Sequence, residues 1–334
     1  MPSSFRVAGK SDVGLVRPGN EDFLHIDEQN AVFAVCDGMG GHQAGEVASM
    51  MAASTLDTAF NRLSRELLAD ETLALGRALP DNGNLLLRAI RLANRGIYTK
   101  AAVDPALNGM GTTVVTLSLK DDMLSVAHVG DSRAYRLEDR SVTPLTSDHS
   151  WVAEIQQQQN ITEAEASKMV GKNVITRALG VRDTVEIDYR LIRVKPGDKF
   201  ILCSDGLCGF ADDDEIFSVA HKAREENERM VESLIQMAND RGGMDNVTVI
   251  VLEITGVSES GLPEVEPFTL PAETAVQLER EDTWLEKINA LLAEKDSADM
   301  EETAVKPQSR VALFVIFALF IIIAAAIVYF STGD

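Results

Sequence analysis

Four aspartates of this sequence stand beside apolar runs that are rich in β-branched residues. Asp37 ends VFAVCD, Asp131 follows SVAHVG, Asp205 follows FILCS, and Asp245 precedes NVTVIVLEI. Such runs are typical of buried strands, so a fold that aligns their ends would gather the four carboxylates on one rigid rim. Carboxylates in such a position repel one another unless a cation offsets their charge. The pattern therefore predicts a divalent metal centre.

The other side chains favour a hard metal ion and a phosphate substrate. The three cysteines, Cys36, Cys203 and Cys208, form no Cys-x-x-Cys pair, so we expect reduced core thiols rather than a zinc site. Ligation by oxygen alone suits Mg²⁺, Mn²⁺ or Ca²⁺. Two such ions that share a carboxylate can acidify a bridging water and neutralise phosphoryl oxygens. Arg17 adds a guanidinium that can bind phosphate bidentately, so the residues are consistent with phosphoester hydrolysis.

Hydrophobic periodicity predicts the elements that must position these residues. Helices are expected over 44–60, 85–100 and 231–238, and strands over 111–120, 123–129, 133–137, 199–203 and 246–254. The acidic run at 212–215 is interpreted as a helix start, with Asp212 as N-cap and Glu215 completing a capping box. The residues at 80–83, PDNG, predict a turn. Strands in hairpins and helices grouped elsewhere favour an α+β layered fold over a doubly wound parallel sheet.

Composition limits the size of the fold and the kinds of partner. The chain has 334 residues, of which 45% are hydrophobic, and a formal net charge of −21. This is enough for one domain of roughly 250 residues with additional segments. The acidic balance argues against nucleic-acid binding, which needs a basic surface. The first residues, MPSSFRVAGKSDVG, carry no apolar stretch of the signal-peptide kind.

The C-terminal part predicts a linker and a membrane anchor. Residues 256–310 are rich in acidic residues and proline, which predicts a largely disordered linker after a domain at 1–255. An amphipathic stretch at 284–292 could form a docking or membrane-surface helix, or only transient helicity. Residues 311–330 carry no charge and span about 30 Å as a helix, which predicts a single transmembrane segment. Lys306 and Arg310 place the catalytic part in the cytoplasm, at the inner or plasma membrane.

Eight motifs in order over residues 11–250 resemble one protein family. They are SDVGLVRPGNED, VCDGMGGHQAGEVAS, GMGTT, VGDSRAY, SDHS, ITRALG, CSDGL and DNVTV. Together they are similar to the motifs of bacterial metal-dependent protein serine/threonine phosphatases (PPM, type 2C). The resemblance implies an α+β fold, a β-sandwich of two antiparallel sheets flanked by helices, with the metal centre at one edge. It also implies a flap beside the site at 150–175.

The resemblance further implies which residues hold two, or three, Mn²⁺ or Mg²⁺ ions. The expected ligands are Asp37 as the bridge, Gly38 through its carbonyl, Asp205 and Asp245 on the second ion, Glu21 and Asp22 directly or through waters, and Asp131 with Asp205 on a third ion.

Four further positions are singled out by the same resemblance. Arg17 matches the arginine that binds the substrate phosphate, and Asn246 the residue that orients the neighbouring ligand. Met39 stands where other members carry a histidine proposed as the general acid. His42 is shared with bacterial members, and we favour a structural role for it over a catalytic one.

The resulting expectation is a membrane-tethered phosphatase that removes phosphate from phosphoserine and phosphothreonine in proteins. A hydroxide bridging two metal ions would attack phosphorus in line, without a phosphoenzyme, and the enzyme would oppose a serine/threonine kinase. Two alternatives remain open at this point. One is a dedicated phosphatase for a single phosphorylated regulatory partner. The other is a catalytically dead scaffold that binds phosphoproteins.

Overall fold

The computed structural model describes residues 3–41, 43–73, 75, 79–159, 161–162, 165–166 and 174–305, without the side chains of residues 43 and 295–305. Its contacts divide the chain into two compact units, Met1–Ile288 and Asn289–Asp334. The first unit contains both β-sheets and the candidate site.

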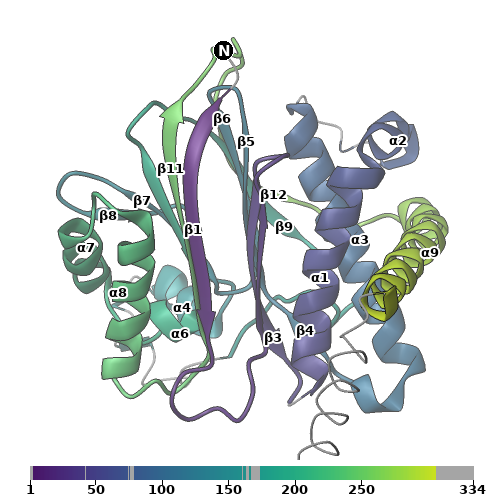
Figure 1. Cartoon of the computed structure of the whole chain (residues 1–334), viewed down its shortest axis with the longest axis horizontal. Helices are drawn as coiled ribbons and strands as arrows, with labels where there is room; N and C mark the ends of the chain where they lie inside the picture. Colours follow the sequence, from purple (N-terminus) through teal and green to yellow (C-terminus); the bar gives the residue numbers. More distant parts are fainter. Residues whose placement is uncertain are drawn as a thin grey trace, which may run out of the picture. The chain divides into compact units, whose positions relative to one another are not determined.

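Two antiparallel sheets form the centre of the first unit (Figure 1). The first sheet has the order β1 (Ser4–Asp12), β11 (Val247–Gly256), β10 (Lys199–Cys203), β7 (Arg133–Leu137) and β8 (Val142–Pro144). The second has the order β12 (Val265–Leu270), β9 (Ile187–Arg193), β6 (Met123–Val129), β5 (Val114–Lys120), β3 (Val32–Met39) and β2 (Asp22–Asp27), with β4 (Gly111–Thr112) beside β3. The predicted α+β fold with two antiparallel sheets is confirmed.

The core explains why the central strands are apolar on both faces. Phe200 and Leu202 of β10 pack between the sheets, together with Phe33 of β3. Ile201 and Cys203 of the same strand face the other way, against helix residues outside the sheet. Because successive side chains of a strand alternate, a strand covered on both faces reads as a continuous apolar run.

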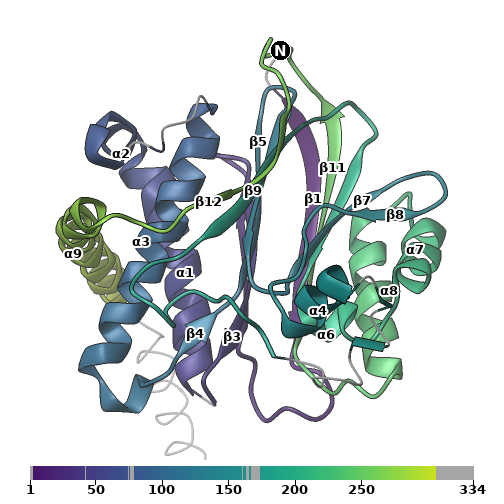
Figure 2. The same ribbon diagram turned by 180° about the vertical axis from the view of Figure 1, so that it is seen from behind.

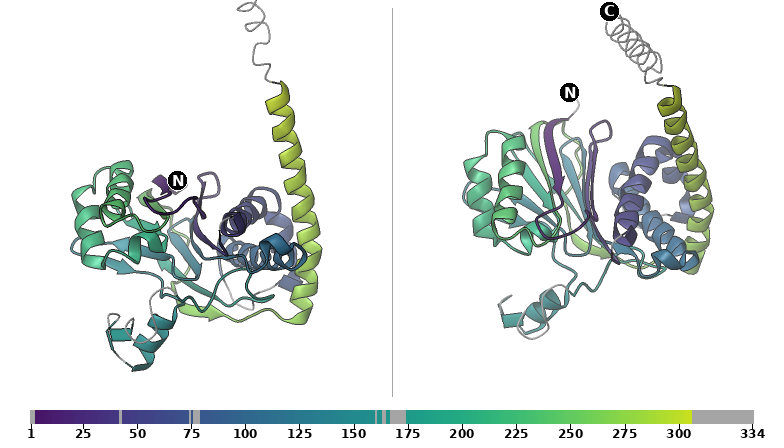
Figure 3. Two further views of the ribbon diagram at one scale, coloured as in Figure 1. Left: turned by 90° about the horizontal axis from the view of Figure 1, so that it is seen from below. Right: turned by 60° about the horizontal axis from the view of Figure 1, so that its bottom comes forward.

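Helices cover the outer face of each sheet. Those on the side of the second sheet are α1 (Gln43–Arg62), α2 (Ser64–Ala69) and α3 (Asp81–Val103), with the short 3₁₀ turns η1 (Glu71–Leu73) and η2 (Pro105–Leu107). Those on the side of the first sheet are α6 (Asp205–Cys208), α7 (Asp213–Lys222) and α8 (Asn227–Asp240). Helix α4 (Trp151–Gln159) stands away from the sheets (Figure 3). The predicted capping box of Asp212 and Glu215 begins α7.

Several predicted elements differ from the structure by a few residues at their ends, and at two places the difference goes further. The expected turn at 80–83 is the start of α3, with Pro80 in an extended conformation at its N-cap. Proline and small polar residues suit the first turn of a helix as well as a loop, and this explains the ambiguity. The strand expected over 111–120 is divided into β4 and β5 at Thr113, whose amide donates to the Asp37 carbonyl.

The expectation of a largely disordered linker at 256–310 is wrong for the described residues to 305. Strand β12 pairs with β9 at the edge of the second sheet (Figure 2), and α9 (Ala275–Val305) follows. In the first unit, Trp284, Leu285 and Ile288 of α9 are buried. The acidic composition of the segment hides these apolar residues, which lie within the amphipathic stretch at 284–292.

Among the residues described, no helix is long and apolar enough to cross a membrane. The transmembrane segment predicted at 311–330 lies outside the described residues.

Candidate active site

A cavity of about 530 Å³ collects the four aspartates that the strand ends predicted. Asp37, Asp131, Asp205 and Asp245 all line it, as does Arg17. The topology explains this convergence. Strands β3 and β6 both pair antiparallel with β5, so their carboxyl ends share one edge of the second sheet. In the first sheet, β10 ends where β11 begins, because these two strands are antiparallel.

Burial and mutual repulsion raise the pKa of three of these carboxyl groups. Burial, followed by repulsion from neighbouring aspartates, raises the pKa of Asp37 well above its ordinary value. Burial and the charge of Asp205 raise the pKa of Asp131 to about 7. Burial and the charge of Asp245 also raise the pKa of Asp205. Groups like these favour the ionised form only when positive charge is brought close, and a divalent cation supplies it.

Asp22 lies behind this cavity, among buried polar groups. Its Oδ2 accepts hydrogen bonds from the hydroxyls of Ser204 and Thr248, each at 2.7 Å. Its Oδ1 is buried and has no hydrogen-bond partner in the part of the chain that the structure describes. Burial raises the pKa of Asp22 to about 7, although the two hydroxyls act in the opposite direction. Asp22 is therefore bonded to the residue that precedes Asp205 and is not among the residues lining the cavity, whereas Glu21 is.

Gly38 is held where no side chain would fit. A Cβ atom at this position would lie 2.2 Å from the carbonyl oxygen of Gly45 and 2.5 Å from that of Glu21. The amide of Gly38 donates to the Glu21 carbonyl at 3.1 Å. The beginning of α1 and the Glu21 backbone therefore press against the strand that carries Asp37, which is a reason for glycine here.

Asn246 fastens the loop that brings Arg17 and Glu21 to the cavity. Its Nδ2 donates to the carbonyls of Val13 and Gly19, both at 2.9 Å, and its Oδ1 accepts from the Glu21 amide at 2.8 Å. Arg17 itself is half exposed and pairs with Asp245 at 2.7 Å. That hydrogen bond raises the pKa of Arg17 above its ordinary value. The guanidinium is thus held at the mouth of the cavity by a solvent-accessible ion pair.

Thr113 is a cavity residue that the predicted site did not include. Its hydroxyl accepts from the Asp37 amide at 3.0 Å, and its own amide donates to the Asp37 carbonyl at 2.9 Å. The hydroxyl also shares a hydrogen bond with Ser132 at 2.8 Å. The only signal was the motif GMGTT, which carried no chemical interpretation by itself.

The remaining predicted positions are described in part. Met39 lines the cavity, and its thioether cannot donate a proton. His42 lies outside the described residues. Of the flap expected at 150–175, the structure describes α4 and the base, where the Trp151 amide donates to the Val174 carbonyl at 3.0 Å.

The protein phosphatase 2C family model matches residues 18–247. The chain belongs to the protein phosphatase 2C family. It is 36% identical over 248 residues to the serine/threonine phosphatase stp of Listeria monocytogenes, which covers 73% of this chain and 94% of that protein. It is 34% identical over 252 residues to the serine/threonine protein phosphatase PstP of Mycobacterium tuberculosis, which covers 75% of this chain and 45% of that protein.

Solved structures show the same similarity in three dimensions. The catalytic domain of the phosphatase PstP, determined in complex with two manganese ions, superposes with a TM-score of 0.64 at 32% identity, over 76% of this chain and 100% of that one. As a protein phosphatase 2C member, the chain is a protein serine/threonine phosphatase. Its oxygen-rich cavity, lined by crowded carboxylates, fits a divalent metal centre.

Proposed function

We propose that the chain hydrolyses phosphoserine and phosphothreonine in proteins at this cavity, with two or three Mn²⁺ or Mg²⁺ ions. The observation that carries the proposal is the meeting of four carboxylates, from four strand ends, with one guanidinium. The two manganese ions in the PstP structure support the choice of metal for this chain. When bound, such ions supply a Lewis acid that acidifies water and neutralises phosphoryl oxygens.

In this proposal some residues of the chain hold the metal ions and others bind the substrate phosphate. The residues that would hold the ions are Asp37, the Gly38 carbonyl, Asp205, Asp245 and Glu21, and Asp131 would join Asp205 in holding a third ion. The hydrogen bond that Asp22 accepts from the Ser204 hydroxyl holds the chain between the end of β10 and Asp205. Arg17 binds the substrate phosphate, which replaces Asp245 as its partner or shares it.

The test is hydrolysis of p-nitrophenyl phosphate and of phosphopeptides by the full chain, purified in detergent, with added Mn²⁺. We expect turnover that EDTA abolishes. Asp205→Asn should lower kcat more than about 100-fold, since a ligand that serves the transition state contributes several kcal/mol. Asp214→Asn is the matched control, because Asp214 is exposed on nearby α7. Turnover that survives EDTA, or that is equal in the two variants, would contradict the proposal.

In this proposal the setting is a membrane. Residues 311–330 anchor the chain, the catalytic unit faces the cytoplasm, and the enzyme opposes a serine/threonine kinase. The supporting observation is the uncharged twenty-residue run preceded by Lys306 and Arg310. Deletion of residues 306–334 should move the protein into the soluble fraction with its activity intact. A truncated chain that still sediments with membranes would contradict the anchor.

A further inference from the structure

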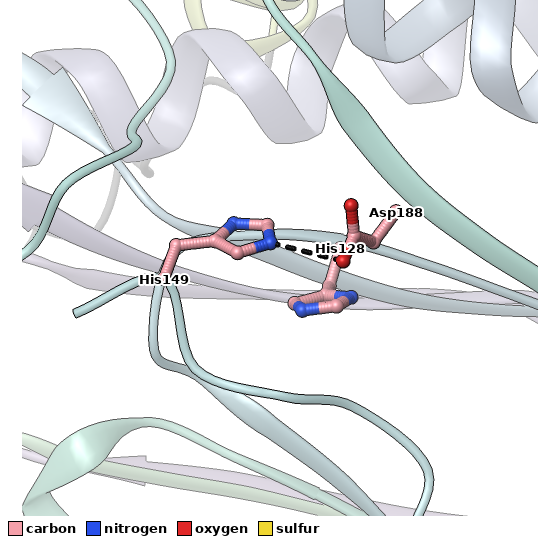
Figure 4. A group of neighbouring side chains, drawn as sticks. All are labelled: His128, His149 and Asp188. Carbon is pink, nitrogen blue, oxygen red and sulfur yellow. Dashed lines mark ion pairs between the residues drawn. The ribbon is translucent and has the colours of Figure 1, made fainter. Parts of the chain in front are cut away.

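A cluster of two histidines and an aspartate lies next to the candidate active site. His128 is on β6, His149 precedes α4, and Asp188 is on β9 (Figure 4). The two imidazoles are stacked, with ring centroids 4.6 Å apart. Nε2 of His149 lies 3.2 Å from Oδ2 of Asp188. The potential ligand atoms of the three side chains all lie within 4.8 Å of one another.

These side chains already have partners that argue against a metal ion. Nη1 of Arg177 lies 3.1 Å from Oδ1 of Asp188 and 3.3 Å from Nε2 of His149, so a guanidinium already supplies the positive charge. Nε2 of His128 donates to the Ser147 carbonyl at 2.8 Å. The cluster is therefore a connected hydrogen-bond network, and its function must be sought in what it holds.

The network fixes the tautomer of His149. The Gly130 amide donates to Nδ1 of His149 at 3.1 Å, so Nδ1 carries no proton. A neutral imidazole then has its hydrogen on Nε2, which faces the Asp188 carboxylate. Arg177 Nη1 and His149 Nε2 are therefore two donors that lie close together because both donate to the Asp188 carboxylate. Stacking on His128 fixes the plane of the ring.

His149 forms two hydrogen bonds with Gly130, the residue that precedes Asp131. Besides the bond to Nδ1, the amide of His149 donates to the Gly130 carbonyl at 3.0 Å. Gly130 has φ +112°, and a Cβ at this position would lie 2.6 Å from the Cβ of Thr113. Thr113 makes the two hydrogen bonds to the Asp37 backbone described above. One turn thus connects His149 with both Asp131 and Asp37.

We infer that His149 is a positioning residue, which fixes the Gly130 turn so that Asp131 and Asp37 face the metal cavity, and that Asp188 sets its tautomer. The inference rests on the proposed function, in which these aspartates are ligands. Asp188 also accepts from the Thr269 hydroxyl of β12 at 2.8 Å. Strand β12, which lies beyond the residues matched by the family model, therefore also helps to hold Asp188 in place.

Two amide variants separate the two bonds of His149. The Oδ1 atom of His149→Asn occupies the place of Nδ1 and can accept from Gly130, but this side chain cannot reach Asp188. The amide of His149→Gln occupies the place of Nε2 and can donate to Asp188, but it leaves the Gly130 amide without an acceptor. Both variants remove the imidazole ring, and the smaller Asn side chain loses more packing than Gln, so a loss of packing alone would affect the Asn variant at least as much as the Gln variant.

The experiment measures Mn²⁺ affinity calorimetrically in the full chain, alongside thermal melts. We expect the Gln variant to bind Mn²⁺ at the weakest site about 10- to 100-fold less tightly than the wild type, as for other groups that orient ligands, and the Asn variant to retain most of the affinity. Gln binding as tightly as Asn would overturn the inference. A wild type that neither binds Mn²⁺ nor turns over would instead overturn the proposed function.

A second measurement needs no variant. The ¹⁵N chemical shifts of the His149 side chain in the wild type report which ring nitrogen is protonated. We expect the proton on Nε2 in the metal-free chain. A proton on Nδ1 would overturn the inference even if the variants failed to fold, because the Gly130 amide could not then donate to that nitrogen.

Discussion

Glu281 gives the most specific prediction about stability, because its carboxylate is buried in α9 without a hydrogen-bond partner. Its side chain is 1% exposed, and neither carboxylate oxygen has a hydrogen-bond partner among the described residues. The nearest cations are already paired. Arg91 lies against Glu273 at 3.4 Å, and Arg95 forms a bidentate pair with Asp282. Burial, followed by the charge of Glu273, raises the pKa of Glu281 to about 8.

The sign and the size of the effect follow from this shift. A carboxyl group with a raised pKa favours the folded state while it is protonated. Its contribution is complete below its unfolded pKa and is lost as the pH rises toward its folded pKa. Between pH 5.5 and 7.5 the loss amounts to roughly 2 kcal/mol. Glu281→Gln keeps the shape and removes this ionisation, so we expect the stability of the variant relative to the wild type to rise by roughly 2 kcal/mol from pH 5.5 to pH 7.5.

The assay is thermal unfolding of the metal-free chain from pH 5 to 8, analysed as the difference in Tm between variant and wild type. The difference cancels the titration of the active-site aspartates, which both proteins share. An effect of roughly 2 kcal/mol corresponds to about 4–8 °C in a unit of this size. Glu286→Gln is the matched control, because Glu286 is exposed on the same helix. A pH-independent difference, or one equal to the control's, would refute the reasoning.

Three further predictions concern α9 and the cavity. Trp284→Phe removes the indole donor to Asp70 and should lower the free energy of unfolding by about 1–2 kcal/mol in urea titrations; an unchanged midpoint would show that the bond contributes nothing. Asp37→Asn should raise the Tm of the metal-free chain by relieving repulsion, yet lower kcat more than about 100-fold with Mn²⁺; a variant that is active, or less stable without metal, would contradict this. Arg17→Ala should raise KM for phosphopeptides while changing stability by less than about 1 kcal/mol, since its ion pair is exposed; denaturant curves and initial rates separate the two effects, and an unchanged KM would exclude the phosphate-binding role.

The sequence could predict the carboxylate cluster because strand ends are visible in hydrophobic patterns. Lys199–Cys203 was predicted with its observed bounds, and the aspartates beside it and its neighbours converge as expected. The antiparallel hairpin of the strands at 111–120 and 123–129 followed from the residues, whereas the two-sheet arrangement was implied only by the family resemblance. The supporting polar residues could not be predicted, because a threonine such as Thr113 acts through backbone hydrogen bonds. Only the tertiary fold shows which backbone it meets.

The C-terminal segment could not be predicted for a different physical reason. Its charged residues look solvated in sequence, yet several pair with the catalytic unit: Arg280 and Trp284 bind Asp70, and Lys287 pairs with Glu66. Composition counts charges and cannot show that their partners lie about 200 residues away. A sparse set of apolar residues at helical spacing is the better indicator, and it is visible in the sequence only over 284–292.

Buried carboxylates with raised pKa values occur at two places in this chain, and their surroundings separate the two roles. Asp37, Asp131 and Asp205 line a cavity of about 530 Å³ that a guanidinium and solvent can enter. Glu281 has similar electrostatics, but it is packed against a helix and does not line that cavity. A raised pKa therefore indicates a site only where there is room for a ligand. Where there is none, the same shift becomes a cost to the stability of the fold.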